Sequence, residues 1–565
     1  MKKIVLALIL ICLGYTATAQ NIASSEAFLI DNIKKVTVDD EVIEQSFEKG
    51  DYDCTYIISI NNTSDDDAYA YEFNAADLNE YKVGFDTKKN EIFVNLETKG
   101  GKDLIREFEN DQVEGYTDEI TFHAADLEHA RSLTENLKML VKACSDLQED
   151  IVSVIGENPG MGDVLDYLTA NIRDVTVNGV SFGQKFSFNP DHTPLMQLEV
   201  TDQAEAELIR YEFNASDINP SSIQFDTKKE FVLVSGETKD KADLIKLYEN
   251  DAVDGFENSF TIYAPNIEEA RKLVEVFKFY ANEAARLQPK ELNLLENAKT
   301  LSAINAFISA HIQEVTVDDE TFKQSYDFQP DEPALASLKI ENVADAEVTE
   351  YNFNLADLNK SEIDFQTKGN EIIIELPAEH KYIRVIENGE LQNYGDEIEL
   401  RARSIEEARL ISSGFKKAAE FGASELDKAF IKGNPTPSQQ ETIKFLGNTI
   451  QEVATGDDIY RQKFEVDEEN NCIVLLEITD VSKAEIIVYK FNLIDINPMK
   501  VEFETSGDEV QVNLTTMGGN DLIEVIENGE TDDFEDAISL RAGSIEQARD
   551  IETALKHLID LCKGN

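Results

Sequence analysis

Hydrophobic and polar residues follow the same order four times along the chain, and each copy opens with a helical pattern. Apolar residues lie at positions i, i+4 and i+7, which places them on one face of a helix. The four sets are Leu29, Ile33 and Val36; Leu168, Ile172 and Val175; Ile308, Ile312 and Val315; and Leu446, Ile450 and Val453. Each copy is therefore predicted to begin with an amphipathic helix.

The middle of each copy alternates apolar and polar residues with a period of two, which is typical of half-buried antiparallel strands. Turn sequences such as Lys368-Gly369-Asn370 separate the alternating segments. The third copy predicts seven strands, over residues 321–328, 334–341, 347–354, 362–367, 371–376, 381–387 and 397–402.

A second helix is predicted at the end of each copy, because apolar residues spaced by three and four define one buried face. This stripe is Leu127, Ala130, Leu133, Leu137, Leu140 and Cys144 in the first copy, and Ile545, Ala548, Ile551, Leu555, Leu558 and Cys562 in the fourth. An Ala-Arg pair recurs at residues 130–131, 270–271, 408–409 and 548–549. We expect the alanine to let the helix lie close to the sheet and the arginine to be solvated.

A short motif sets the period of the repeat. Tyr71-Glu72-Phe73-Asn74 returns in similar form at residues 211, 351 and 489, so the spacing is 140, 140 and 138 residues. This period is too long for a solenoid unit and matches the size of a whole domain. The predicted organisation is a leader, residues 1–19, and four tandem α+β domains, residues 20–148, 160–287, 298–425 and 438–565. Short, partly stiff connections are expected between the domains.

About seven antiparallel strands followed by one amphipathic helix resembles the pleckstrin-homology-like fold in the order of its elements. The resemblance implies a PH-like barrel or sheet in each domain, preceded here by an extra helix. The chain departs from that superfamily in having no tryptophan. Lipid-binding members carry Lys and Arg in the first loop between strands, whereas the loops here are mostly acidic, so phosphoinositide binding is not expected. Those loops are residues 48–54, 189–194, 329–334 and 467–472. The alternative fold is another α+β sheet with two helices on one face.

The N-terminus has the pattern of a secretory signal peptide. Lys2 and Lys3 precede an apolar run that extends to Leu13, and an Ala-x-Ala site ends at Ala19. The apolar run is too short to span a membrane. We therefore expect cleavage after Ala19 and an exported product, periplasmic or extracellular, that is not inserted in a membrane.

The net charge bounds the possible partners. The whole sequence carries a charge of −61, and loss of the two leader lysines gives −63 for the mature chain. Such a surface repels nucleic acid and anionic lipid, so neither is expected as a partner. The acidic residues are spread over all four copies, which favours a role in solubility. Attraction for cations or basic partners is the functional alternative.

Four of the five cysteines form equivalent pairs. Cys54 and Cys144 are 90 residues apart, and so are Cys472 and Cys562. The second and third copies lack both members of the pair, with Pro194 and Ala284 in one and Ala334 and Gly422 in the other. Paired presence and paired absence in an exported protein predict one disulfide within the first domain and one within the fourth. Two buried free thiols per domain are the alternative, and the spacing does not fit a zinc site.

An aromatic residue follows the sixth predicted strand of every copy. These residues are Tyr116, Phe256, Tyr394 and Phe534. Either the ring fills the underside of its own loop, or it is exposed and contacts a partner. The neighbouring carboxylates suggest weak calcium binding, although they do not follow the EF-hand pattern. They are Asp111, Glu114 and Asp118 in the first copy, and Asp532, Asp533 and Asp536 in the fourth.

The motif Asn74-x-x-Asp77 also recurs in every copy, at residues 214–217, 354–357 and 492–495. An asparagine followed three residues later by an aspartate is typical of a local cap on a short helical turn. The motif is therefore interpreted as structural.

The sequence contains no recognisable catalytic or cofactor motif. No two of the six histidines occupy the same repeat position, and there is no Gly-rich phosphate loop, G-x-S-x-G or H-E-x-x-H. The chain is therefore predicted to be an exported, non-catalytic tandem-repeat binding or scaffold protein without a cofactor, whose partner is a protein or a glycan. Repetition would supply avidity. A hydrolase with a carboxylate-based site in one domain and a structural spacer are the alternatives.

Overall fold

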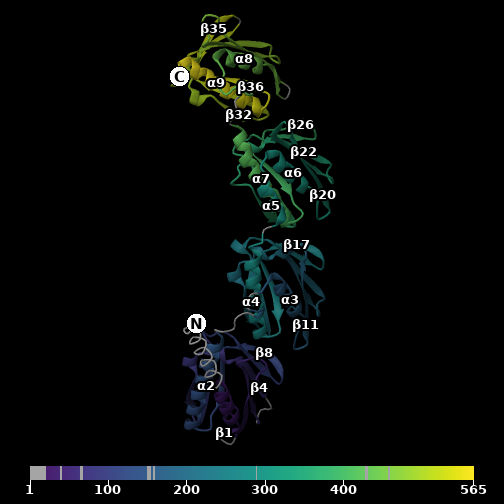
Figure 1. The fold of residues 1–565 in the computed structure, drawn as a ribbon, viewed down its shortest axis with the longest axis vertical. Helices are drawn as coiled ribbons and strands as arrows, with labels where there is room; N and C mark the ends of the chain where they lie inside the picture. The colour runs from purple at the N-terminus through teal and green to yellow at the C-terminus, as the bar shows by residue number, and fades with distance from the viewer. Residues whose placement is uncertain are drawn as a thin grey trace, which may run out of the picture. The chain divides into compact units, whose positions relative to one another are not determined.

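A computed structural model describes residues 21–38, 41–63, 68–148, 154–156, 159–287, 289–426, 430–455, 458–527 and 529–564. The leader and its cleavage site lie outside these residues. The chain divides into two compact units, Met1–Gln288 and Pro289–Asn565. Each unit contains two repeats of one arrangement of sheets and flanking helices (Figure 1).

The first unit contains repeats 1 and 2. Repeat 1 consists of helical residues 21–32, β1 (Val36–Val38), β2 (Glu41–Lys49), β3 (Thr55–Asn62), β4 (Ala68–Asn74), η1 (Ala75–Asp77), η2 (Glu80–Lys82), β5 (Gly84–Lys88), β6 (Glu91–Glu97), β7 (Ile105–Glu109), β8 (Gln112–Thr117), β9 (Glu119–His123) and α2 (Leu127–Gln148). Repeat 2 consists of α3 (Met161–Asn171), β10 (Val175–Val177), β11 (Val180–Asn189), β12 (His192–Asp202), β13 (Glu207–Asn214), η3 (Ala215–Asp217), η4 (Pro220–Ser222), β14 (Gln224–Lys228), β15 (Phe231–Glu237), η5 (Lys239–Lys241), β16 (Ile245–Glu249), β17 (Ala252–Glu257), β18 (Ser259–Ala264) and α4 (Ile267–Ala284).

The second unit opens with α5 (Lys290–Asn297) and contains repeats 3 and 4. Repeat 3 consists of α6 (Leu301–His311), β19 (Val315–Val317), β20 (Glu320–Gln329), β21 (Glu332–Asn342), β22 (Glu347–Asn354), η6 (Leu355–Asp357), β23 (Asp364–Lys368), β24 (Glu371–Pro377), β25 (Arg384–Glu387), β26 (Glu390–Leu391), β27 (Glu397–Arg401) and α7 (Ile405–Leu426). Repeat 4 consists of α8 (Gln439–Thr449), β28 (Val453–Thr455), β29 (Asp458–Val466), β30 (Ile473–Asp480), β31 (Glu485–Asn492), η7 (Leu493–Asp495), η8 (Pro498–Lys500), β32 (Glu502–Ser506), β33 (Glu509–Thr515), β34 (Ile523–Glu527), β35 (Glu530–Glu535), β36 (Ala537–Ala542) and α9 (Ile545–Lys563).

The strands of each repeat form two antiparallel sheets. In repeat 1 the larger sheet has the order β1-β2-β3-β4-β7-β8 and the smaller one has the order β5-β6-β9. The chain leaves the larger sheet after β4, forms the β5-β6 hairpin, and returns to pair β7 with β4, where Tyr71 lies opposite Glu107. The seven strands predicted for the third copy are confirmed as β20–β25 and β27. The alternating pattern missed β26, because two residues are too few to show an alternation. The valine predicted at i+7 of each opening helix is instead the first residue of a short strand, β1, β10, β19 or β28.

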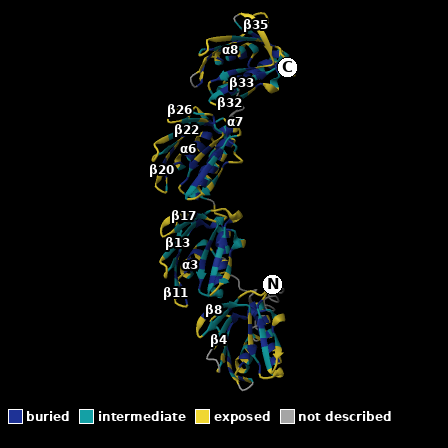
Figure 2. Cartoon of the chain, turned by 180° about the vertical axis from the view of Figure 1, so that it is seen from behind, coloured by how far each residue is buried: buried dark blue, intermediate teal, exposed yellow. Residues whose placement is uncertain are grey.

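The core of each repeat is built by the inner faces of the sheets and the closing helix (Figure 2). In repeat 1, Val94 of β6 and Phe122 of β9 pack with Leu133 and Leu137 of α2 in one buried cluster. This arrangement follows from the sequence, since period-two strands and a helix with a three-four stripe each present one apolar face.

A buried glutamine joins the two sheets in every repeat. Gln45 of β2 donates from Nε2 to the carbonyl oxygens of Lys34 and His123, and its Oε1 accepts from the His123 backbone N–H at 2.7 Å. The same hydrogen bonds recur around three other glutamines, Gln184, Gln324 and Gln462. A buried amide with both of its ends paired ties the segment that follows the opening helix to the larger sheet and to the last strand.

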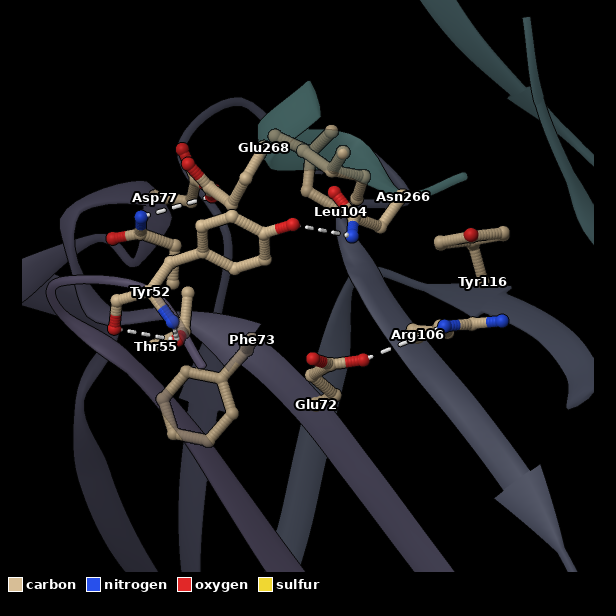
Figure 3. Close-up of a pocket in the computed structure, with 12 residues that line it drawn as sticks. Tyr52, Thr55, Glu72, Phe73, Asp77, Leu104, Arg106, Tyr116, Asn266 and Glu268 are labelled. Carbon is tan, nitrogen blue, oxygen red and sulfur yellow. Dashed lines mark hydrogen bonds and ion pairs between the residues drawn. The ribbon is translucent and has the colours of Figure 1, made fainter. Parts of the chain in front are cut away.

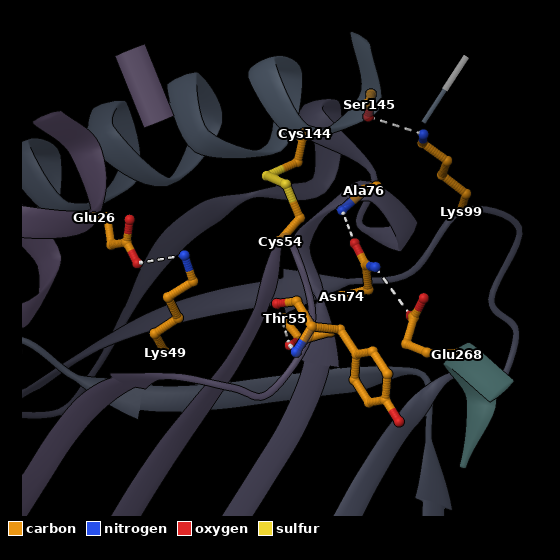
Figure 4. The surroundings of a disulfide bond; sticks show 11 residues. Glu26, Lys49, Cys54, Thr55, Asn74, Ala76, Lys99, Cys144, Ser145 and Glu268 are labelled. Carbon is orange, nitrogen blue, oxygen red and sulfur yellow. Dashed lines mark hydrogen bonds and ion pairs between the residues drawn. A yellow bond between two sulfur atoms is a disulfide. The ribbon is translucent and has the colours of Figure 1, made fainter. Parts of the chain in front are cut away.

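Two disulfides lie within single repeats. Cys54–Cys144 joins the residue before β3 to the last turns of α2 (Figure 4). Cys472–Cys562 makes the equivalent connection in repeat 4. The Cα–Cα distance is 5.8 Å in both, which is typical of a disulfide. The pairing predicted from the joint presence and joint absence of these cysteines is confirmed.

Candidate functional site

The most elaborate arrangement of polar groups lies where one repeat meets the next within a unit. We call it the joint, and define it by the 3-10 turn and β7-β8 region of the first repeat together with the start of the closing helix of the next. Joint A lies between repeats 1 and 2, and joint B lies between repeats 3 and 4.

The 3-10 turn at joint A is built by the Asn-x-x-Asp motif. The Asn74 side chain accepts from the Ala76 backbone N–H at 2.9 Å, so the predicted local cap is confirmed. The other end of the same amide reaches the next repeat, because Asn74 Nδ2 donates to Glu268 Oε1 at 2.9 Å (Figure 4). The motif therefore orders its own turn and also contacts α4.

A buried ion pair lies at the centre of each joint. The Arg271 guanidinium of α4 donates to Asp77 Oδ2 at 2.5 Å in joint A, and Arg549 of α9 donates to Asp357 Oδ1 at 2.6 Å in joint B. The aspartate side chains are only 8% and 7% exposed. Charge-assisted bonds of this length fix the orientation of both partners.

These ion pairs correct the expectation that the arginine of the Ala-Arg pair is solvated. Arg271 and Arg549 lie in the joints, and each also stacks over a phenylalanine of its own repeat, Phe225 or Phe503. Arg131 of repeat 1 is exposed and pairs with Glu128 of its own helix, as expected. The helical pattern placed these arginines outside the core of their own repeat but gave no information on a neighbouring repeat.

Burial perturbs the acidic member of each pair. Loss of water raises the pKa of Asp77, and this effect outweighs the attraction of Arg271. The same cause raises the pKa of Asp357 to about 6, against the opposing effects of Arg549 and, more weakly, His380. The Asp357 carboxyl is therefore still ionised at pH 7 and titrates just below it.

The aromatic residue after the sixth predicted strand contacts the next repeat. Tyr116 packs against the core of repeat 2, and Tyr394 belongs to the buried cluster of repeat 4 and is 6% exposed. The Tyr394 backbone N–H also donates to the Gly507 carbonyl at 3.0 Å. Burial raises the pKa of Tyr116 to about 12. Phe256 is half-buried, whereas Phe534 is 51% exposed.

Further hydrogen bonds close joint A along the edge of the larger sheet. The Asn178 side chain accepts from the Val113 N–H and donates to the Val113 carbonyl, so it occupies the free edge of β8. The Thr227 hydroxyl donates to the Asp103 carbonyl at 2.9 Å. The equivalent contact in joint B runs from Thr505 to the Lys381 carbonyl at 2.8 Å. Both joints therefore use residues at equivalent positions.

Small cavities lie inside the joints. Tyr52, Glu72, Leu104, Arg106 and Tyr116 of repeat 1 face the start of α4 around a space of about 30 Å³ in joint A (Figure 3). That volume suits one or two water molecules and is far below that of a metabolite site. The equivalent cavity in joint B, which includes Tyr394, Ile545 and Glu546, has a volume of about 220 Å³.

A more open groove of about 990 Å³ runs beside joint A. Its charged lining is balanced, with Lys99, Lys102, Arg271 and Lys278 against Asp77, Asp103, Asp226 and Glu275. Equal numbers of cations and anions do not select a ligand of either charge.

The acidic residues proposed for calcium do not assemble into a site. Within the part of the chain that the structure describes, no group of three or more His, Cys, Asp or Glu side chains is arranged to hold a metal ion. None of the helices among the described residues is long and apolar enough to cross a membrane.

No protein-family model, curated protein or solved structure matches this chain. The resemblance to the pleckstrin-homology-like fold therefore stays a prediction, and so do the domain boundaries.

Proposed function

We propose that the chain is an exported, non-catalytic scaffold in which the repeats of each unit are docked onto one another. The observation that carries this proposal is the recurrence of the same joint in both units, with the same ion pair and a tyrosine packed into the following repeat. A flexible array needs none of these contacts, whereas a scaffold that presents its repeats at a fixed spacing does.

Two further features support the proposal. Each disulfide fixes one repeat of each unit, and disulfides are compatible with an oxidising, exported compartment. In joint A the side chains of Asn74 and Asp77 pair with Glu268 and Arg271 of the next repeat, and the cavity between the repeats holds only about 30 Å³. A protein or glycan partner would bind the outer surfaces of the repeats, which the joints hold at fixed positions relative to each other within a unit.

Calorimetry of the mature chain tests the proposal with a matched pair of variants. Arg271→Ala removes the joint ion pair and leaves Asp77 buried without its counter-charge, so the melting temperature of the first unit should fall. Arg131→Ala is the control, since Arg131 occupies the same helix position and likewise pairs with a glutamate three residues earlier. Equal melting temperatures for the two variants would contradict a docked scaffold.

A further inference from the structure

Each joint brings together two different faces. The tail face comes from the earlier repeat and, in joint A, consists of Asn74, Asp77, Leu104 and Tyr116. The head face comes from the later repeat and consists of Phe225, Thr227, Ile267, Glu268 and Arg271. Because the two faces differ, every repeat has one of each.

Repeat 1 has the complete head face. The equivalent residues are Phe85, Thr87, Leu127, Glu128 and Arg131. This face is open: Leu127 is 44% exposed, whereas its counterpart in joint B, Ile545, is 4% exposed. The Arg131 side chain is 55% exposed, compared with 25% for Arg271. The residues that form a joint elsewhere are therefore present here and accessible.

Repeat 4 has the complete tail face. The equivalent residues are Asn492, Asp495, Leu522 and Phe534. Asn492 caps its 3-10 turn in the same way as Asn74, so the turn is preformed. Large apolar side chains are exposed on this face, namely Phe534 at 51% and Leu522 at 46%. Every residue of β35, which carries Phe534, is exposed, whereas its counterpart β8 is partly covered by repeat 2.

We propose that the tail face of repeat 4 binds the head face of repeat 1 in a second copy of this chain. Asp495 would pair with Arg131, and Phe534 would pack beside Leu127, as Tyr394 packs beside Ile545. Both joints contain this pair of faces, so a second copy of the chain carries the surface that each open face fits. An interface between two different faces is heterologous, so it extends into a filament or closes into a ring.

Two physical effects set the conditions for this association. The two faces are not held near each other by a linker, so they lack the effective concentration, in the millimolar range, that short tethers provide. The high negative charge of the chain opposes contact between copies at low ionic strength, but near-physiological salt limits this repulsion to about 8 Å. Association is therefore expected at high protein concentration and to strengthen as salt is added.

Sedimentation equilibrium of the mature chain at near-physiological salt tests the inference. The average molar mass of the unmodified chain should rise as the protein concentration is raised to about 1 mM, which is the effective concentration that a short tether would provide. Phe534→Glu blocks the tail and Leu127→Glu blocks the head, and each variant alone should stay monomeric. In an equimolar mixture, one variant keeps the head face of repeat 1 and the other keeps the tail face of repeat 4, so the mixture should form a one-to-one dimer and nothing larger.

Matched controls separate this effect from added charge. Met139→Glu on α2 and Ile486→Glu on β31 also place a carboxylate at an exposed apolar position, and both should associate like the unmodified chain. Arg131→Asp or Asp495→Arg should each weaken association at least tenfold. The double variant Arg131→Asp/Asp495→Arg should restore it to within about threefold, because the opposite charges face each other again.

Three results would overturn the inference: a monomeric chain at about 1 mM, a Phe534→Glu variant that still self-associates, or a mixture without the dimer. These outcomes are distinct from failure of the proposed scaffold, on whose joints the inference rests. If the chain is monomeric while Arg271→Ala is less stable than Arg131→Ala, the docked scaffold holds and only the contact between copies is wrong.

Discussion

Truncation of Tyr394 should open joint B and leave the repeats folded, and the structure gives the size of the effect. Tyr394 is 6% exposed and its equivalent Phe534 is 51% exposed. For an aromatic side chain of about 200 Å², the difference is about 90 Å² removed from water by docking. At about 25 cal/mol/Å² this burial contributes about 2 kcal/mol, or about 30-fold in the opening equilibrium.

Hydrogen exchange is the suitable assay, because the Tyr394 N–H donates to the Gly507 carbonyl only when the joint is closed. In Tyr394→Ala, peptides that cover residues 392–396 and the start of α9 should lose about 30-fold in protection. Phe534→Ala is the control, and it should change protection in its own region by less than threefold, as is usual for exposed positions. Equal effects of the two substitutions would show that burial of Tyr394 does not hold joint B closed.

Three other predictions concern the disulfides, pH and processing. Reduction should destabilise repeats 1 and 4 by on the order of 4–5 kcal/mol each, since each disulfide has a sequence separation of 90, while repeats 2 and 3 keep their stability in denaturant titrations. Closed joint B binds a proton more tightly than open joint B, because burial in the closed joint raises the pKa of Asp357 to about 6 against the opposing effect of Arg549. Its closure, measured by exchange protection corrected for intrinsic rates, should therefore strengthen by at least about 1 kcal/mol from pH 7 to pH 5. Asp357→Asn should reduce that dependence without abolishing it, because burial also raises the pKa of Asp550 to about 6. Intact mass of the exported protein should show Gln20 as the first residue, and a retained leader would contradict this.

Features repeated within one domain could be read from the sequence. The strands have a period of two and the closing helix has a three-four stripe, so each pattern reports directly which face is buried. The disulfides were predictable for a related reason, because two copies lack both cysteines and two contain both. Each pattern occurs in four copies, so an assignment of buried faces that would be ambiguous in one copy is supported by the other three.

The joints could not be predicted in the same way. Arg271 and Asp77 are polar residues on the surfaces of their own repeats, and nothing local to either distinguishes a solvated side chain from a docked one. Their pairing depends on how repeats 1 and 2 dock, and the two residues are 194 positions apart in the sequence. One signal was present: an aspartate, an arginine and an aromatic residue recur at fixed positions in all four copies without any role in the core of their own repeat. The buried glutamines were missed because a polar residue in a strand is ordinarily assigned to the solvent face.

The most direct test of the docked scaffold is the distance between repeats 1 and 2, measured by electron–electron double resonance. Spin labels attached through Glu135→Cys on α2 and Asn282→Cys on α4 occupy exposed positions of the mature chain. Docked repeats should give one narrow distance distribution, which is unchanged by Arg131→Ala and broadened by Arg271→Ala combined with Tyr116→Ala. A broad distribution in the chain without joint substitutions would contradict the docked scaffold.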